Sequence, residues 1–214
     1  MRTLLIKLLL LVIATVSELA AQVAIPNGDF NQFETIYSQD QEYEIPVGWR
    51  EHPRNEEWRQ SYGEVFAYKY ELPDANKNAL ALHRGYLAQS NEILTSFLVP
   101  AHMEDLQLIG RYKFSGSDID RAEDVLRIIV ISSEKVIHMI SDTHLEDANI
   151  LNITTPKAQF NRFHLDIDKI QKNTYVTIVI QLISGSDDSF YWGQSNAVLD
   201  DLKFVFNHRI TSIH

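Results

Sequence analysis

The chain has 214 residues, 45% of them hydrophobic and 22% charged, which is enough for one domain with a sizeable core and too few for two full domains. Its formal net charge is −10 and its Lys and Arg residues form no stripe, so nucleic acid is excluded as a partner. Cysteine is absent, which excludes a disulfide framework and leaves the core to stabilise the fold.

The first 21 residues have the features of a secretory signal peptide. Arg2 and Lys7 precede an uncharged apolar run over residues 8–16, and small residues follow, ending at Ala21. The run is shorter than the roughly 20 residues that span a bilayer, which argues against a retained anchor. We therefore expect cleavage after Ala21, a secreted, periplasmic or cell-surface protein, and no membrane insertion after cleavage.

Beyond the signal segment the chain divides into short runs of β-branched and aromatic residues, separated by Gly, Pro, Asn, Asp and Ser. Residues 174–183 are apolar on both alternating faces, which is typical of a central strand covered on both sides. In contrast, Phe163, Leu165 and Ile167 alternate with polar residues, as in a strand with one wet face. The expected strands are residues 63–70, 79–83, 106–114, 125–131, 135–140, 160–167, 174–183 and 197–206.

Eight or more short strands without long intervening helices predict an all-β protein. The expected architecture is an antiparallel two-sheet β-sandwich, with a jelly roll favoured over a closed barrel. The domain organisation that follows is a signal peptide over residues 1–21, a jelly-roll β-sandwich domain over residues 22–207 and a C-terminal tail over residues 208–214.

Two short motifs lie near the two ends of the expected sandwich. Asn27-Gly28-Asp29-Phe30 begins as a turn, and Leu199-Asp200-Asp201-Leu202 interrupts an alternating strand with two adjacent carboxylates. Carboxylates are costly in a half-buried sheet unless they have partners. The two motifs together suggest a fold that is closed by its own ends.

These end motifs, together with Pro46-Val47-Gly48-Trp49, residues 78–82 and residues 108–114, resemble the jelly-roll carbohydrate-binding modules of secreted bacterial proteins. The resemblance is to the galactose-binding-domain-like group, including its carbohydrate-metabolism domains, and covers roughly residues 23–206. It implies non-catalytic binding of a glycan or a cell-surface polysaccharide. It also implies that Trp49 is a core residue.

The resemblance further implies a structural calcium site. In many members of the group, a Glu after Asn-Gly-x-Phe joins a carboxylate of the last strand, whereas this chain has Asn31 at that position, with one charge fewer. The candidate metal ligands are Asp29, Asn31 and Asp200. In the alternative, Asp200 accepts hydrogen bonds from the Asn27-Gly28 turn and joins the two ends without a metal.

A sugar site on a sandwich needs flat apolar faces and a few planar polar side chains. Trp58 lies among charged residues in an expected loop, and Trp192 lies between a polar loop and the last expected strand. They are the candidate aromatic platforms, and the alternative is that each anchors its loop at an end of the sandwich. The candidate ligand-binding residues are Trp58, Trp192, Tyr191, Arg59, Tyr62 and Gln194.

The sequence predicts that the protein is not an enzyme. It contains no His-Glu-x-x-His, Gly-x-Ser-x-Gly, phosphate-binding glycine loop or cysteine nucleophile. Asp166 and Asp168 would lie about 6.6 Å apart on one strand face, which suits a glycosidase pair, but no neighbour distinguishes an acid from a base. The alternative to glycan binding is a structural or adhesive cell-surface module that binds protein.

Overall fold

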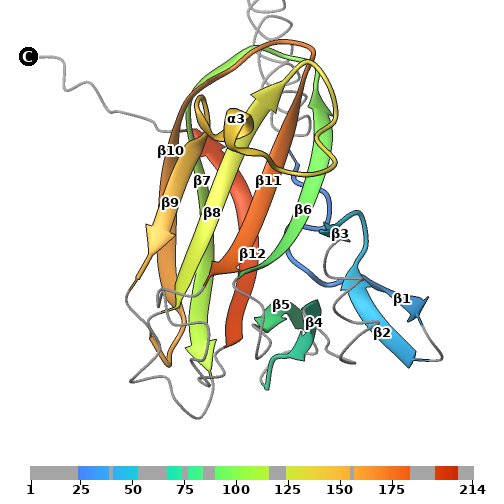
Figure 1. The fold of residues 1–214 in the computed structure, drawn as a ribbon. Coiled ribbons are helices and arrows are strands. Elements are labelled where there is room, and N and C mark those ends of the chain that lie inside the picture. The colour runs from blue at the N-terminus through green and yellow to red at the C-terminus, as the bar shows by residue number, and fades with distance from the viewer. Residues whose placement is uncertain are drawn as a thin grey trace, which may run out of the picture.

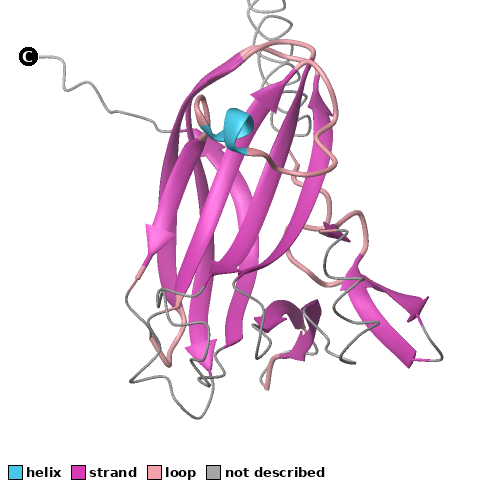
Figure 2. Cartoon of the chain, in the orientation of Figure 1, coloured by secondary structure: helices cyan, strands magenta, loops and turns pink. Residues whose placement is uncertain are grey.

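The computed structural model describes residues 24–38, 41–52, 67–73, 77–83, 90–115, 124–154, 157–183 and 196–206. They form two five-stranded sheets that pack face to face and a separate two-stranded hairpin (Figures 1 and 2). Within these ranges, no helix has the length and apolar character needed to cross a membrane. The elements are β1 (Phe33–Ser38), β2 (Gln41–Pro46), β3 (Arg50–Glu51), β4 (Ala67–Glu71), β5 (Asn78–His83), β6 (Ser90–Val99), β7 (Met103–Ser115), β8 (Val125–Ser133), α3 (Asp142–Leu145), β9 (Asn149–Ile153), β10 (Asn161–Ile170), β11 (Thr174–Ile183) and β12 (Asn196–Phe206).

The order of the strands is that of a jelly roll. The first sheet has the order β10-β7-β12-β5-β4, and the second has the order β3-β6-β11-β8-β9, with antiparallel neighbours throughout. From β5 to β12 the chain changes sheet at every connection except the one between β8 and β9 (Figure 1). The predicted all-β, two-sheet jelly roll is confirmed.

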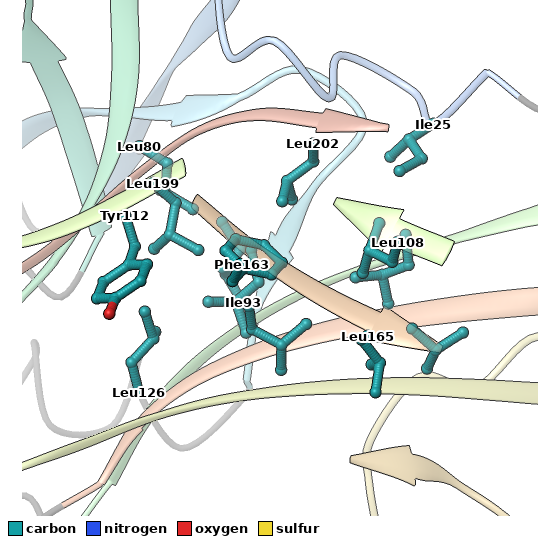
Figure 3. Close-up of a cluster of buried hydrophobic side chains, with 14 of the residues drawn as sticks. Ile25, Leu80, Ile93, Leu108, Tyr112, Leu126, Phe163, Leu165, Leu199 and Leu202 are labelled. Carbon is teal, nitrogen blue, oxygen red and sulfur yellow. The ribbon is translucent and has the colours of Figure 1, made fainter. Parts of the chain in front are cut away.

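The core lies between the two sheets and is built from alternate residues of each strand. In β10, Phe163, Leu165 and Ile167 are buried while their outward neighbours are exposed, so the predicted wet face is confirmed. Figure 3 shows Phe163 and Leu165 among side chains of the opposite sheet, including Ile93 and Leu126.

The middle strand of the second sheet, β11, is covered on both sides as its sequence predicted. On its outer face, Val179 packs with Ile129 and Ile137 beneath residues 134–148, which include α3 (Figure 1). The strand predicted over residues 135–140 is wrong, because this stretch forms bends and no ladder. Its apolar residues cover a sheet instead of extending one.

The remaining differences concern strands that the sequence did not reveal. β6 pairs with β11 along all ten of its residues, and it was missed together with β1, β2, β3 and β9. Of the strand predicted over residues 63–70, the structure describes only the part in β4. The strands predicted over residues 79–83, 106–114, 125–131, 160–167, 174–183 and 197–206 are confirmed, with their ends shifted by a few residues.

The two ends of the domain meet, as the paired motifs suggested. The backbone N–H of Leu202 donates a 2.8 Å hydrogen bond to the carbonyl of Gly28. Next to this contact, Phe30 is fully buried and its ring lies 5.3 Å from that of Trp49. Trp49 is 3% exposed and its Nε1 donates to the carbonyl of Pro26 at 3.0 Å, so the expected core tryptophan is confirmed.

Candidate functional site

β12 contains a β-bulge at its two adjacent carboxylates. The register between β12 and β7 shifts between Asp200 and Lys203, and Asp201 has a φ of 55°, a left-handed conformation that Asp adopts more readily than most residues. The extra residue brings Asp200 and Asp201 to the same partner, Arg111 of β7. It also lets Leu202 return to the core (Figure 3).

Arg111 is the ion-pair partner of both carboxylates. Its Nη2 binds the carboxylate of Asp200 and lies 3.0 Å from Oδ2 of Asp201. Asp200 is 1% exposed, and its Oδ1 accepts a 2.8 Å hydrogen bond from the backbone of Asp201. Burial raises the pKa of Asp200 and the charge of Asp201 raises it further, while the hydrogen bond and charge of Arg111 oppose both effects.

The structure places the three candidate calcium ligands with different partners. Asn31 donates from Nδ2 to Oδ2 of Asp29 at 2.9 Å, whereas the carboxylate of Asp200 is directed to Arg111. Among the described residues, no group of three His, Cys, Asp or Glu side chains is arranged to hold a metal. These residues do not form a calcium cage by themselves, and calcium binding stays a prediction that melting with and without chelator tests.

The alternative role for Asp200 needs a correction. Its carboxylate accepts hydrogen bonds from Arg111 and the backbone of Asp201 and none from the Asn27-Gly28 turn in the described contacts. The turn reaches β12 through the backbone of Leu202 instead. The side chain of Asn27 stabilises its own loop, exchanging hydrogen bonds with the backbone of Gln32 at 2.6 and 3.1 Å.

A groove of about 510 Å³ lies beside this ion-paired bulge. It runs over β10, β7 and β12 of the first sheet, on the face directed away from the core, and we call it the outer groove. Its volume is in the range usual for small-molecule sites. The outward-facing lining residues are Gln107, Ile109, Arg111, Arg162, His164, Asp201 and Lys203, and the buried Gly110 and Phe163, at core-facing positions between them, complete the lining.

The antiparallel register sets the order of the side chains in the outer groove. Arg162 of β10 lies directly opposite Arg111 of β7. Two residues further along β10, His164 lies opposite Ile109, which in turn lies opposite Lys203 of β12. The polar groups therefore form rows across three strands, and the side chain of Ile109 lies between His164 and Lys203 as an apolar strip.

A further polar row borders the groove. Nε2 of Gln107 donates a 2.6 Å hydrogen bond to Oδ1 of Asp166 on β10. This bond orients the amide of Gln107, a planar group that can donate to and accept from a ligand hydroxyl. Since the groove side chains project from paired strands, the sheet holds their positions with less freedom than loops would.

Aromatic rings adjoin the groove on its other side. Phe160 precedes β10 and is half-buried, with the guanidinium of Arg111 5.3 Å from its ring centroid. Nζ of Lys113 lies 5.1 Å from the same ring and 4.4 Å from that of Tyr70, whose hydroxyl it contacts at 2.8 Å. The cations and rings together extend a mixed polar and aromatic surface along β7.

The ligand-binding residues predicted from the sequence, Trp58, Trp192, Tyr191, Arg59, Tyr62 and Gln194, all lie outside the described residues. The outer groove uses different residues. The one sign of this groove in the sequence was the predicted solvent-exposed face of β10, where Arg162 and His164 alternate with buried residues. The pairing of that face with β7 and β12 was not visible, because register depends on contacts between segments far apart in the chain.

No family model and no curated protein matches this chain. Among solved structures, a candidate glycoside hydrolase of Bacteroides thetaiotaomicron superposes with a TM-score of 0.53 at 12% identity, covering 83% of this chain and 70% of that chain. A candidate sugar-binding protein of the same organism gives a TM-score of 0.46 at 9% identity, with coverages of 85% and 98%. The module TmCBM61, solved with β-1,4-galactotriose, gives 0.39 at 10% identity, with coverages of 86% and 98%. The likeness to the first structure extends over most of the chain and establishes a shared fold.

Proposed function

We propose that the protein is a non-catalytic carbohydrate-binding module that holds a glycan in the outer groove. The observation that carries the proposal is the composition of this groove, in which planar hydrogen-bonding side chains surround an apolar strip. Gln107, Arg162 and His164 offer donors and acceptors to sugar hydroxyls, while Ile109 offers contact to the C–H face of a ring. Such a combination suits a flat, hydroxyl-rich ligand.

The firm placement of Arg111 supports the same function. Asp200 and Asp201 orient its guanidinium before any ligand arrives, so less side-chain freedom is lost on binding. The neighbouring ring of Phe160 adds an aromatic surface at the end of the groove. Trp58 and Trp192 remain predicted contributors to the binding surface.

Contacts of the nearby carboxylates favour binding over hydrolysis. A glycosidase pair needs two accessible carboxyl groups with distinct protonation states on either side of the scissile bond. Asp200 is buried, Asp201 is ion-paired with Arg111, and Asp166 accepts a hydrogen bond from Gln107. The proposal therefore assigns these carboxylates to structure and orientation.

Export belongs to the same proposal. A signal peptide over residues 1–21 would deliver the domain to the periplasm, the cell surface or the medium, where glycans and cell-surface polysaccharides are accessible. The predicted structural calcium would act on stability and has no role in this binding site.

A glycan array tests the proposal with the mature domain. We expect binding to at least one glycan, at least tenfold weaker binding for the double variant Gln107→Ala/Arg162→Ala, and unchanged binding for Lys169→Ala, which lies on β10 outside the groove. We also expect no release of reducing ends from the bound glycan. If no glycan on the array binds, a structural or adhesive module that binds protein is favoured instead. Release of sugar from the bound glycan would contradict the non-catalytic assignment.

A further inference from the structure

The outer groove carries more positive charge than its own carboxylates neutralise. Three cationic side chains, Arg111, Arg162 and Lys203, line it, against two carboxylates, that of Asp201 in the lining and that of the buried Asp200 beside it. Asp201 pairs with Arg111, while Arg162 and Lys203 are exposed and have no ion-pair partner among the residues that the structure describes. This local excess is notable in a chain whose net charge is −10.

The two arginines of the groove differ in their ion-pair partners. Arg162 and Arg111 are directly opposite each other on neighbouring strands and project from the same sheet face. Arg111 is already compensated by the carboxylates of Asp200 and Asp201. Those carboxylates lie on β12, on the far side of Arg111, so Arg162 makes no ion pair among the described residues. An anion bound in the groove would give Arg162 the partner that it lacks.

We propose that the outer groove selects glycans that carry carboxylate groups, with Arg162 as the residue that recognises the carboxylate. This inference rests on the proposed glycan-binding function and names its substrate class. The planar fork of a guanidinium matches a carboxylate with two parallel hydrogen bonds. Lys203 lies two strands away and two residues further along, at roughly 12 Å by strand spacing and rise, and contributes a second, less directional positive charge.

The same surface discriminates against other polyanions. The net negative charge of the whole chain repels densely charged polymers, whereas screening confines the attraction of the groove to about 8 Å at physiological salt. Binding therefore requires hydroxyl contacts to Gln107 and His164 in addition to charge. A uronic-acid glycan provides both, since each sugar ring combines a carboxylate with hydroxyls.

The experiment compares matched ligands by titration calorimetry on the mature domain. The probes are tetramers of galacturonate, glucuronate, mannuronate and guluronate, each paired with its own methyl ester, which keeps the shape and removes the charge. At least one acid should bind about tenfold or more tightly than its ester at 50 mM salt, and the difference should shrink at 500 mM. Arg162→Gln should abolish the difference, while Lys169→Gln, on the same strand outside the groove, should leave it intact.

The other possible results show whether the carboxylate inference fails alone or together with the proposed glycan binding. If acids and esters bind equally, or if only neutral glycans from the array bind, the carboxylate inference fails and glycan binding stands. If neither these tetramers nor any array glycan binds, both fail. Tighter binding of sulfated oligosaccharides, or equal binding of polyglutamate through Arg162, would also overturn the assignment, because charge alone would then explain the affinity.

Discussion

Arg111 connects the interior of the domain with its candidate binding surface. On one side it neutralises Asp200, which is buried, and on the other it faces Arg162 across the β7–β10 ladder. An ion pair with one buried member contributes little net stability, yet loss of the exposed partner leaves the buried charge uncompensated. The arginine is therefore important for folding as well as for the proposed binding.

Replacing this arginine tests the structural half of its role. We expect Arg111→Met to lower the free energy of unfolding at pH 7 by about 2–3 kcal/mol, since the carboxylate of Asp200 then lacks its partner. Asp201→Asn, at a half-exposed carboxylate, should change it by less than about 1 kcal/mol. Urea denaturation of both variants and of Arg111→Met/Asp200→Asn checks this. Full stability of Arg111→Met, or no recovery in the double variant, would refute the role assigned to the pair.

The raised pKa of Asp200 predicts how stability depends on pH. The native state keeps this proton to a higher pH than the unfolded chain, in which an aspartate has a pKa of about 3.9. The stabilisation from the retained proton is complete below that value and is lost as pH rises through the native pKa. Relative to Asp200→Asn, the wild type should thus lose stability as pH rises. Urea denaturation from pH 3.5 to 7 measures this, and a constant or opposite difference would count against it.

At the scale of elements, the turn at Asn27-Gly28 and the last strand stabilise each other. A Cβ at Gly28 would lie 2.3 Å from the carbonyl oxygen of Leu202, so the turn can approach β12 only with glycine here. We expect Gly28→Ala to lower the free energy of unfolding by about 2–3 kcal/mol. Gly48→Ala is the matched control, because its left-handed backbone costs about 1 kcal/mol while its Cβ would have space. Equal losses in thermal or urea denaturation would show that the close contact is unimportant.

Residues 134–148 show how a second layer covers a sheet that is apolar on both faces. Ile137 is 5% exposed against Ile129 and Val179, whereas Met139, two residues on, is 51% exposed. We expect Ile137→Ala to cost about 2–4 kcal/mol and Met139→Ala less than about 0.5 kcal/mol. Chemical denaturation of the two variants measures the contrast. If the two variants are equally stable, residues 134–148 do not stabilise the outer face of the second sheet by covering it.

The same segment illustrates which features the sequence could predict. Alternation identified β10 and β11 because each face of those strands has a consistent polarity. The apolar residues of 135–140 also predicted a strand, because a pattern of hydrophobic residues indicates which side chains are buried and not which backbone groups are hydrogen-bonded. β6 was missed because Ser, Asn, Glu and Thr interrupt its apolar pattern, and its burial depends on pairing with distant β3 and β11.

For the candidate site, local signals were weaker than for the fold. The two end motifs indicated that the termini of the domain meet, but the partner of Asp200 was unreadable because Arg111 is 89 residues away in the chain. Aromatic residues in the expected loops were the stronger local signal for a sugar site. The outer groove instead arises from three strands whose neighbours in space are not neighbours in sequence.

For the whole molecule, the jelly roll supplies a stiff sheet on which the outer groove is built. Its inner face is a continuous core, and its outer face over β10, β7 and β12 presents cations, amides and an apolar strip. The overall charge of −10 opposes non-specific attraction of polyanions, so recognition depends on contacts in the groove. Binding on this face is the central claim about function.

NMR mapping of the bound ligand on the mature domain tests that claim most directly. The probe is the glycan that binds most tightly on the array or in the titrations. We predict that the largest amide shift changes fall on the groove strands, at Gln107, Arg111, Arg162, His164 and Lys203, and that Gln107→Ala/Arg162→Ala reduces them at the same ligand concentration. Shift changes confined to residues outside the groove, such as the predicted loops with Trp58 and Trp192, would contradict the account.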